Sequence, residues 1–420
     1  MTNNELIIRQ TLQYQNLSAS TIAKATGLSQ PTVSRTLKKM LVLKLGGGRS
    51  TVFALIETIE PISIYQANAE GNISIIGKLY RQPNGRTLLT SKTNHHKYDN
   101  LPFYLYDSLP TGFLGDITLK NILKHDSTLS IKSQDWSDNQ ILHYLTHYGY
   151  DLTGNIILSS NMAHQAAEQQ HPIITQNEYS EISQSINKIP DNLGSSIAGE
   201  QPKFTVFNGN EHLIVKYSPL FSEDNPIAIR HRDLMICEHL ALQTLQENGI
   251  ASAKTSLLFH DRIYLEIKRF DRIGHYGRQG MVSLRSIDAE YAGKNTTWPD
   301  IAKELLSKKL ISQDEFFIIE ICYAFGLYIA NSDMHNGNFS FFMNDLTIGT
   351  TTPVYDMLPM AFMPRQGELR NPAISLPRFI NCSDSAKNKA KKIATIFWQS
   401  VMQHQKISKE FKVLTQDLHR

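Results

Sequence analysis

The feature that most constrains this chain of 420 residues is a polar loop that follows a long apolar run. The run, 316–330, is interrupted only by Glu320 and predicts a buried helix. The loop reads N-S-D-M-H-N-G-N at 331–338, and a strand-like F-S-F-F follows at 339–342. A helix, a polar loop, a strand and a tight return to Asp356 form the layout of a kinase catalytic loop with its metal-binding aspartate.

Three residues of this segment fit phosphoryl transfer from a magnesium nucleotide. That reaction needs a carboxylate to accept the proton of the attacking hydroxyl, and oxygen ligands for Mg²⁺, a hard cation. Asp333 is the candidate base, and Asn338 and Asp356 are the candidate metal ligands. Asp, His and Asn are also common loop residues, so an ordinary polar loop is the alternative that spacing alone leaves open.

Composition narrows the class of protein. An apolar fraction of 41% and a charged fraction of 19% predict a globular chain, and its length allows two or three domains. Three cysteines far apart argue against a disulfide framework or a zinc site and favour a reducing cytosol. We expect a cytoplasmic protein with no membrane partner, because 316–330 is too short to span a bilayer and no targeting segment is visible.

The first 56 residues are strongly basic. They hold seven Lys or Arg against a single acidic residue, Glu5, which gives a net charge of +6. Residues 5–15 predict a helix with Leu6, Ile7 and Leu12 inward, and 20–25 predict a short second helix that ends at Gly27.

A third helix is predicted to begin after Ser29, a good N-cap, with Val33 and Leu37 on its buried face. Two helices joined by a tight turn predict a helix-turn-helix, and the glycine-rich 46–50 with the strand-like 51–55 predicts the wing of a winged helix. The DNA-binding candidates lie outward or in the wing: Gln30, Thr32 and Ser34 as base readers, and Arg35, Lys38, Lys39 and Arg49 as phosphate contacts. A small helical cap with solvated charges is the alternative.

The middle of the chain predicts a small sheet and then the phosphate side of a nucleotide site. Apolar residues alternate with polar ones at 62–65, 73–76 and 86–89, which predicts antiparallel strands, and the polar 164–187 is predicted to include a connecting segment. The small residues of 192–204 suit a phosphate loop, although a hairpin turn is the alternative. Lys216 ends an apolar strand and could neutralise phosphates or reach solvent; Glu238, on a predicted helix, could pair with it or face solvent.

Four segments in chain order resemble the HipA-type serine/threonine kinases, bacterial toxin kinases of toxin–antitoxin systems. These segments are S-I-A-G-E-Q-P-K at 196–203, I-K-R-F-D-R at 267–272, the loop at 331–340, and Y-D-M-L at 355–358. The resemblance runs from about residue 61 to the C-terminus. The fused helix-turn-helix is similar to one branch of the family; in the typical system a separate antitoxin supplies that module.

The resemblance implies an α+β fold, with an N-terminal winged helix-turn-helix before a two-lobed kinase-like fold. The expected domains are 1–58, the DNA-binding module; 59–170, a subdomain with the small antiparallel sheet; 171–280, the kinase N-lobe elements with phosphate loop and hinge; and 281–420, a mostly helical C-lobe with the catalytic loop. The implied cofactors are ATP and Mg²⁺. The implied ATP-binding residues are Ser196, Ile197, Ala198, Gly199, Lys216, Lys268, Phe270, His335 and Asn338.

The resemblance also implies regulation and partners. Ser196, or its neighbour Ser195, matches an autophosphorylated serine whose added charge would repel the nucleotide. Family substrates include aminoacyl-tRNA synthetases, so a protein Ser or Thr is the expected acceptor. Double-stranded operator DNA is an expected partner, and an antitoxin is left open. A homodimer is left open too, since such modules usually read two half-sites.

Two positions depart from the family. Lys268 stands where the family usually has Glu, and Cys237 replaces the Asn before Glu238. The main alternative function is a transcriptional regulator whose kinase-like domain senses a nucleotide or another ligand. A sugar-kinase-type repressor is disfavoured, because its cysteine-rich zinc motif and D-x-G-x-T motif are absent from the sequence.

Overall fold

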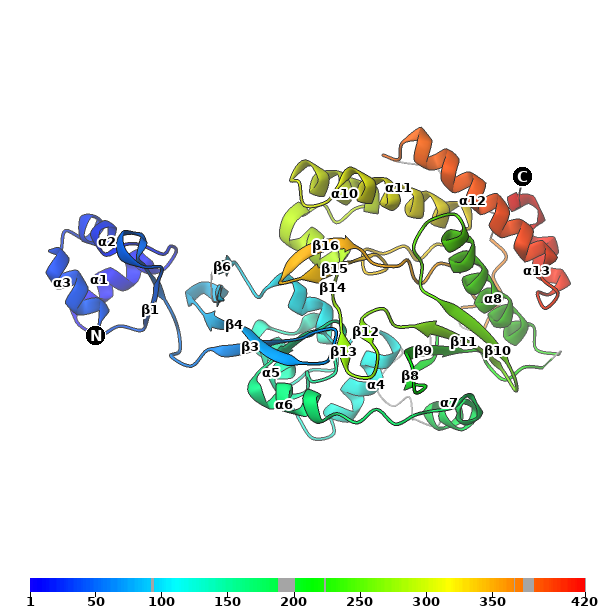
Figure 1. The fold of residues 1–420 in the computed structure, drawn as a ribbon, viewed down its shortest axis with the longest axis horizontal. Coiled ribbons are helices and arrows are strands. Elements are labelled where there is room, and N and C mark those ends of the chain that lie inside the picture. Colours follow the sequence, from blue (N-terminus) through cyan, green and yellow to red (C-terminus); the bar gives the residue numbers. More distant parts are fainter. Residues whose placement is uncertain (92–93, 188–200, 223, 366, 373–380, 420) are drawn as a thin grey trace.

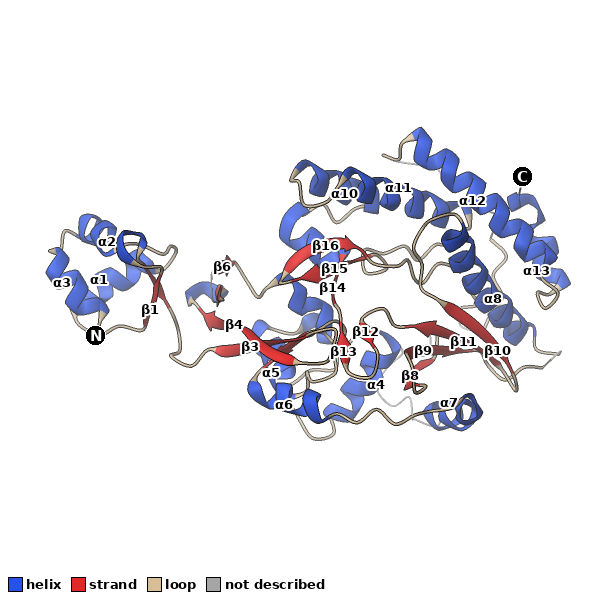
Figure 2. Ribbon diagram, viewed as in Figure 1, coloured by secondary structure: helices blue, strands red, loops and turns tan. Residues whose placement is uncertain are grey.

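The computed structural model describes residues 1–420 except 92–93, 188–200, 223, 366, 373–380 and 420. The chain is elongated, with a small N-terminal module at one end and the larger part of the molecule at the other (Figure 1). In the larger part, helices pack around sheets of five, four and three strands, and a two-stranded hairpin is the fourth sheet among the described residues there (Figure 2). In the described residues no helix is both long and apolar enough to cross a membrane.

The N-terminal module consists of three helices and a hairpin. Its elements are α1 (Asn3–Leu12), α2 (Ala19–Thr26), α3 (Gln30–Leu37), β1 (Val42–Leu45) and β2 (Val52–Leu55). The predicted ends of the second and third helices are confirmed: Gly27 adopts φ +72°, and the Ser29 hydroxyl caps α3. The prediction that Leu6 points inward is wrong, because this side chain is 41% exposed. Ile8 takes its place beside Leu12, one helical turn away on the same face.

A five-stranded antiparallel sheet follows, in the order β6-β5-β4-β3-β7. Its strands are β3 (Ile62–Ala67), β4 (Ile73–Arg81), β5 (Thr87–Thr90), β6 (His95–Tyr98) and β7 (Ile156–Leu158), and the associated helices are α4 (Gly112–Ile122), α5 (Asp138–His147) and α6 (Ser160–Glu168). The predicted strands in this region are therefore confirmed. The N-terminal hairpin packs on this sheet through Leu45, Ala54 and Leu88, which form a small buried cluster.

A four-stranded antiparallel sheet, in the order β10-β11-β9-β8, forms the next unit. Its strands are β8 (Lys203–Phe207), β9 (His212–Tyr217), β10 (Thr255–Phe259) and β11 (Ile263–Lys268), and the long helix α8 (Pro226–Glu247) contacts β10 and β11. The segment predicted to be a connection contains a further helix, α7 (Tyr179–Asn187). Tyr179 is buried against Phe204 and Tyr264, so this helix covers the sheet.

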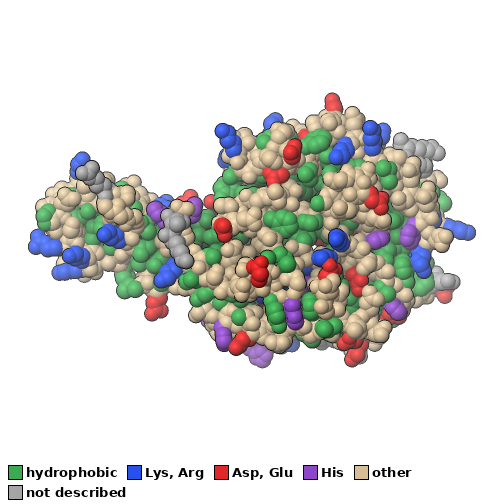
Figure 3. Space-filling model, in the orientation of Figure 1, with side chains coloured by type: hydrophobic (Ala, Val, Ile, Leu, Met, Phe, Trp, Pro, Cys, Tyr) green, Lys and Arg blue, Asp and Glu red, His purple; other side chains and the backbone are tan. Residues whose placement is uncertain are grey.

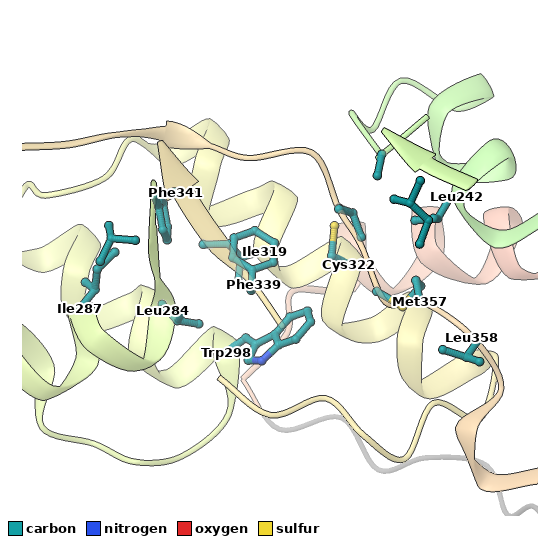
Figure 4. Close-up of a cluster of buried hydrophobic side chains, with 14 of the residues drawn as sticks. Leu242, Leu284, Ile287, Trp298, Ile319, Cys322, Phe339, Phe341, Met357 and Leu358 are labelled. Atoms are coloured by element: carbon teal, nitrogen blue, oxygen red, sulfur yellow. The ribbon is translucent and has the colours of Figure 1, made fainter. Parts of the chain in front are cut away.

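The C-terminal part has more strands than predicted. It contains α9 (Leu284–Ile287), α10 (Trp298–Ser307), α11 (Gln313–Tyr328), α12 (Asp384–Gln403) and α13 (Lys409–Thr415), together with a sheet of β14 (Gly280–Ser283), β15 (Ser340–Asn344) and β16 (Thr347–Thr351). Beneath this sheet lies a buried cluster that includes Trp298, Phe339 and Phe341 (Figure 4). The predicted apolar helix corresponds to α11, and the 331–338 loop leads from it into β15.

A short hairpin, β12 (Arg272–Ile273) with β13 (Gly277–Arg278), links the four-stranded sheet to β14. It docks on the turn between β3 and β4, where the Arg278 amide donates to the Asn68 carbonyl at 2.9 Å. A Cβ atom at Gly277 would overlap the carbonyl oxygens of Ala69 and Ile273. The hairpin therefore requires glycine at this position.

We expect Gly277→Ala to lower the free energy of unfolding by about 1–3 kcal/mol, because the backbone must shift to admit one methyl group. Urea denaturation of the full chain measures this. Gly47→Ala is the matched control, since a Cβ atom there meets nothing within 4 Å. A loss in Gly277→Ala no larger than in Gly47→Ala would contradict the close docking.

Candidate active site

A cleft of about 860 Å³ lies where the five-, four- and three-stranded sheets of the larger part approach one another. Its walls come from α4 and its neighbours, from β8, β9 and β11, and from β14 and the loops that flank β15. Five predicted site residues line it: Lys216, Lys268, Phe270, His335 and Asp356. The predicted phosphate-loop residues Ser195, Ser196, Ile197, Ala198 and Gly199 lie outside the described residues.

Lys216 is shared by two carboxylates. Its Nζ lies 2.6 Å from Glu238 Oε1 on α8 and also contacts Asp356 Oδ1. The Lys216 side chain is 7% exposed and the Glu238 side chain is 2% exposed. The Lys216–Glu238 ion pair, which the sequence left open, therefore forms and is buried. The Asp356 side chain is 37% exposed and faces the cleft.

The charges of this group shift one another's pKa values. Burial would raise the pKa of the Asp356 carboxyl, but Lys216 and Lys203 outweigh it and lower that pKa to about 2. Burial would lower the pKa of Lys216, and the two carboxylates raise it instead. Burial raises the pKa of Glu238 even though Lys216 opposes the shift. At neutral pH the ammonium and the Asp356 carboxylate therefore both stay charged at the floor of the cleft.

The 331–338 loop is held by hydrogen bonds within itself. Asn338 Nδ2 donates to the Asp333 carbonyl at 2.7 Å, and the Asp333 amide donates to Asn331 Oδ1 at 3.1 Å. Asp333 is exposed, and no hydrogen bond to its carboxylate is formed by any residue in the described part of the chain. The loop thus presents a free carboxylate while its backbone stays fixed.

Tyr355 connects this loop to Asp356. Its hydroxyl donates to the Gly337 carbonyl at 2.8 Å and lies 2.7 Å from Ser340 Oγ. His335 braces the same loop: its Nδ1 accepts from the Gly337 amide at 3.1 Å and lies 3.3 Å from an Arg285 nitrogen. Because two N–H groups point at Nδ1, the neutral tautomer with its proton on Nε2 fits this geometry.

The predicted hinge segment is anchored by a buried carboxylate. Asp271 accepts from Arg269 at 2.9 and 2.7 Å and from Arg272 at 2.7 Å, and the Gly154 amide donates to it at 3.1 Å. Burial would raise the pKa of Asp271, but the two guanidinium groups lower it well below its usual range. A second nitrogen of the Arg272 guanidinium donates to Asp151 Oδ1 at 2.9 Å, which connects the hinge to the segment before β7.

Two hinge residues that were predicted to bind ATP have partners within the protein. Lys268 Nζ pairs with Glu211 Oε1 at the rim of the cleft. The Phe270 ring lies 5.8 Å from that of Tyr355, measured between centroids, and 6.1 Å from that of Phe342. Phe270 therefore forms part of an aromatic wall beside the cleft.

The oxygen donors fit a cation that also binds phosphate. Asp356 Oδ2 and Asn338 Oδ1 accept no hydrogen bond within the described residues, and no set of three His, Cys, Asp or Glu side chains there could enclose a metal. Mg²⁺ usually keeps several waters and binds through one or two carboxylates plus substrate phosphates, so a protein cage is not required. The donor set fits Mg²⁺ brought in with a nucleotide.

Among the cleft residues that were not predicted as site residues are Lys203, Arg285 and Asp107. Lys203 lies directly opposite Lys216 in the β8–β9 ladder, a relationship that the strand register could have revealed. Arg285 lies on α9 against the 331–338 loop, and Asp107 lies in a 3₁₀ helix (Phe103–Ser108) of the middle part. No local pattern in the sequence marks either of these two.

Most of the DNA-binding candidates lie in α3 or directly after its end. Gln30, Ser34, Arg35, Lys38 and Lys39 are exposed, and Lys and Arg side chains gather on the outer end of the module in Figure 3. Thr32 is half-buried, and its hydroxyl lies 2.8 Å from Ser29 Oγ in the helix cap. Arg49 lies in the turn between β1 and β2.

We expect Lys216→Met to lower the free energy of unfolding by about 3–5 kcal/mol, because two carboxylates would then face each other without a cation. Lys216→Met with Glu238→Gln should recover part of this loss in urea denaturation. Lys268→Met removes a half-exposed pair instead and should cost less than about 1 kcal/mol. A double variant that is no more stable than Lys216→Met would contradict the shared pair.

Sequence comparison assigns the two larger parts of the chain. Residues 195–414 match the HipA-like C-terminal domain, and residues 58–167 match the middle domain of YjjJ-like toxins. The chain is 31% identical over 421 residues to toxin YjjJ of Escherichia coli K12, covering 96% of this chain and 94% of that protein.

The fold agrees with that assignment. The chain superposes with a TM-score of 0.54 on a chain of the Shewanella oneidensis MR-1 toxin–antitoxin complex of HipA, HipB and operator DNA. The match covers 85% of this chain and 95% of that one at 15% identity, so it supports the fold alone. The motifs, the family matches and the fold together show that the chain belongs to the HipA-like family, in the branch of the YjjJ-like toxins.

Proposed function

We propose that the chain is a serine/threonine protein kinase that transfers the γ-phosphate of ATP to a protein hydroxyl. The observation that carries the proposal is the buried Lys216 shared by Glu238 and Asp356 at the floor of the cleft. The exposed carboxylate of Asp333 lies on the loop that also supplies His335 and Gly337 to the cleft lining. A lysine held by a helix glutamate and placed next to a metal-binding aspartate is what phosphoryl transfer requires of a kinase.

Each residue has a role in this proposal. Lys216 neutralises phosphate charge, and Asn338 and Asp356 hold the cation. Bound Mg²⁺ would supply charge neutralisation between the phosphates. Asp333 accepts the proton of the substrate hydroxyl, whose oxygen forms the new bond to phosphorus as the bond to ADP breaks. His335 fixes the loop, and Lys268 and Phe270 border the nucleotide. Ser196 or Ser195 would be the autophosphorylated residue of the phosphate loop.

We also propose that residues 1–58 form a winged helix-turn-helix that binds operator DNA. The exposed basic face of α3 and the hairpin beside it support this, with Arg35, Lys38, Lys39 and Arg49 on phosphates and Gln30 and Ser34 on bases. Thr32 is a weaker candidate because its hydroxyl serves the cap. The remaining proposed domains are 59–170, 171–280 and 281–420. The solved relative contains an antitoxin and operator DNA, which motivates autoregulation by a homodimer here.

The acceptor proposed for the kinase is a protein of the cytosol, with an aminoacyl-tRNA synthetase as the first candidate. The E. coli relative is a toxin, which supports a target whose modification slows growth. A regulator that only senses a nucleotide remains the competing function. It predicts ATP binding without transfer, so the following experiment separates the two.

Asp333→Asn should lower phosphate incorporation by about 10²- to 10⁴-fold, because the substrate hydroxyl loses its base. The assay uses ATP labelled at the γ-position, Mg²⁺, and casein as a generic acceptor, with EDTA to remove the metal. Asp345→Asn is the matched control, since Asp345 is exposed in the β15–β16 turn. Binding of ATP by the wild type without any incorporation would favour the sensor.

Arg35→Ala should weaken binding to DNA from the protein's own promoter. The slope of log K against log salt concentration should fall by about one, as expected for the loss of one phosphate contact. Fluorescence anisotropy over a salt series measures both. Lys392→Ala removes the same charge from the exposed face of α12 and should leave binding unchanged. Equal effects of the two substitutions, or no binding by the wild type, would overturn the DNA-binding proposal.

A further inference from the structure

We infer that Asp107, which lies in the middle part of the chain, is a positioning residue for phosphoryl transfer. Its carboxylate fixes helix α9, and α9 holds the 331–338 loop that carries Asp333 and Asn338. The kinetic consequence rests on the proposed kinase function, whereas the structural consequence does not. Neither the motifs nor the family matches assign this residue a role.

Asp107 makes three short hydrogen bonds to the start of α9. Its Oδ2 accepts from the Ser283 amide at 2.6 Å, and its Oδ1 accepts from the hydroxyls of Ser283 and Ser286 at 2.6 and 2.7 Å. Ser283 is the N-cap of α9 and accepts from the Ser286 amide at 3.2 Å. The carboxylate therefore organises the whole cap from another part of the molecule.

The next two amides of α9 hold the loop. The first N–H groups of a helix have no partner within the helix, so they must bond elsewhere. Here the Leu284 amide donates to the Phe339 carbonyl at 2.8 Å, and the Arg285 amide donates to the Asn336 carbonyl at 2.9 Å. These two bonds flank Asn338, the proposed metal ligand.

Side chains of α9 reinforce the same contact. Leu284 is fully buried in the cluster that contains Trp298, Phe339 and Phe341 (Figure 4). The Arg285 guanidinium contacts His335 Nδ1. A Cβ atom at Gly337 would overlap this guanidinium, so glycine at position 337 leaves space for Arg285. A helical segment this short is not stable by itself, because α9 has four residues and continues only through a π-helical turn at Asp288–Ala292. Its geometry therefore depends on the cap that Asp107 supplies, and the loop depends on that geometry.

Asp107→Asn tests the inference, with Glu320→Gln as the matched control. Glu320 is also buried and accepts from the amide and the hydroxyl of one serine, Ser383, at 2.6 and 2.8 Å. It caps α12 instead of α9. Ser286→Ala is a milder variant that removes one of the three bonds, in case Asp107→Asn fails to fold.

Two readouts on the full chain are expected to change together in Asp107→Asn. Hydrogen exchange at the amides of Leu284, Arg285 and 335–339 should accelerate by about tenfold or more, and kcat for casein phosphorylation should fall about tenfold or more. The dissociation constant for ATP measured without Mg²⁺ should stay within about threefold, because Lys216 is untouched and Asn338 contributes only through the cation. Glu320→Gln should accelerate exchange only around 383–387 and leave kcat unchanged. Ser286→Ala should shift the same two readouts in the same direction by less.

An unchanged kcat in Asp107→Asn, or a fall in kcat matched by Glu320→Gln, would overturn the positioning role. Unchanged exchange at 335–339 would overturn it as well. If the wild type transfers no phosphate, the kinase proposal fails by itself. The exchange readout then still decides whether Asp107 holds the loop.

Discussion

The interaction on which the rest of the site depends is the buried ammonium of Lys216 between two carboxylates. It brings together strand β9, helix α8 and the segment that ends at Asp356. An isolated charge at this depth would be costly, so the three elements are held to one another by the need to pair it. The half-exposed side of Asp356 then faces the cleft with its charge retained.

Around the Lys216 group, two further carboxylates connect the middle part of the chain to the hinge and to α9. Asp271 joins the hinge to the segment before β7 through two arginines, and Asp107 joins the middle part to α9. The middle part is therefore built into the site, although it lies far from the 331–338 loop in sequence. The N-terminal module packs on the five-stranded sheet through β1, β2 and β5, and lies away from the β9–α8 region (Figure 1). Coupling between DNA and the cleft would have to pass through the five-stranded sheet.

The sequence predicts the parts of this structure that local patterns control. Apolar spacing and a cap predict α3, a continuous apolar run predicts α11, and alternation predicts β3, β4 and β5. Relations that depend on tertiary contacts were missed: α7 in a polar segment, the β14–β16 sheet, and the inward choice of Ile8 over Leu6. The bond between Asp107 and Ser283 joins residues with no shared motif. A serine N-cap such as Ser283 can be predicted from sequence, but only the fold shows that Asp107 is its hydrogen-bond partner.

The most direct test of the central claim is quantitative phosphoproteomics of cells that express the wild-type chain or Asp333→Asn at equal levels. We expect phosphoserine or phosphothreonine to appear on a discrete protein target with the wild type only. Growth should slow with the wild type and not with the variant. Identical phosphorylation in the two strains, with the wild-type chain folded and able to bind ATP, would contradict the claim that this cleft transfers phosphate.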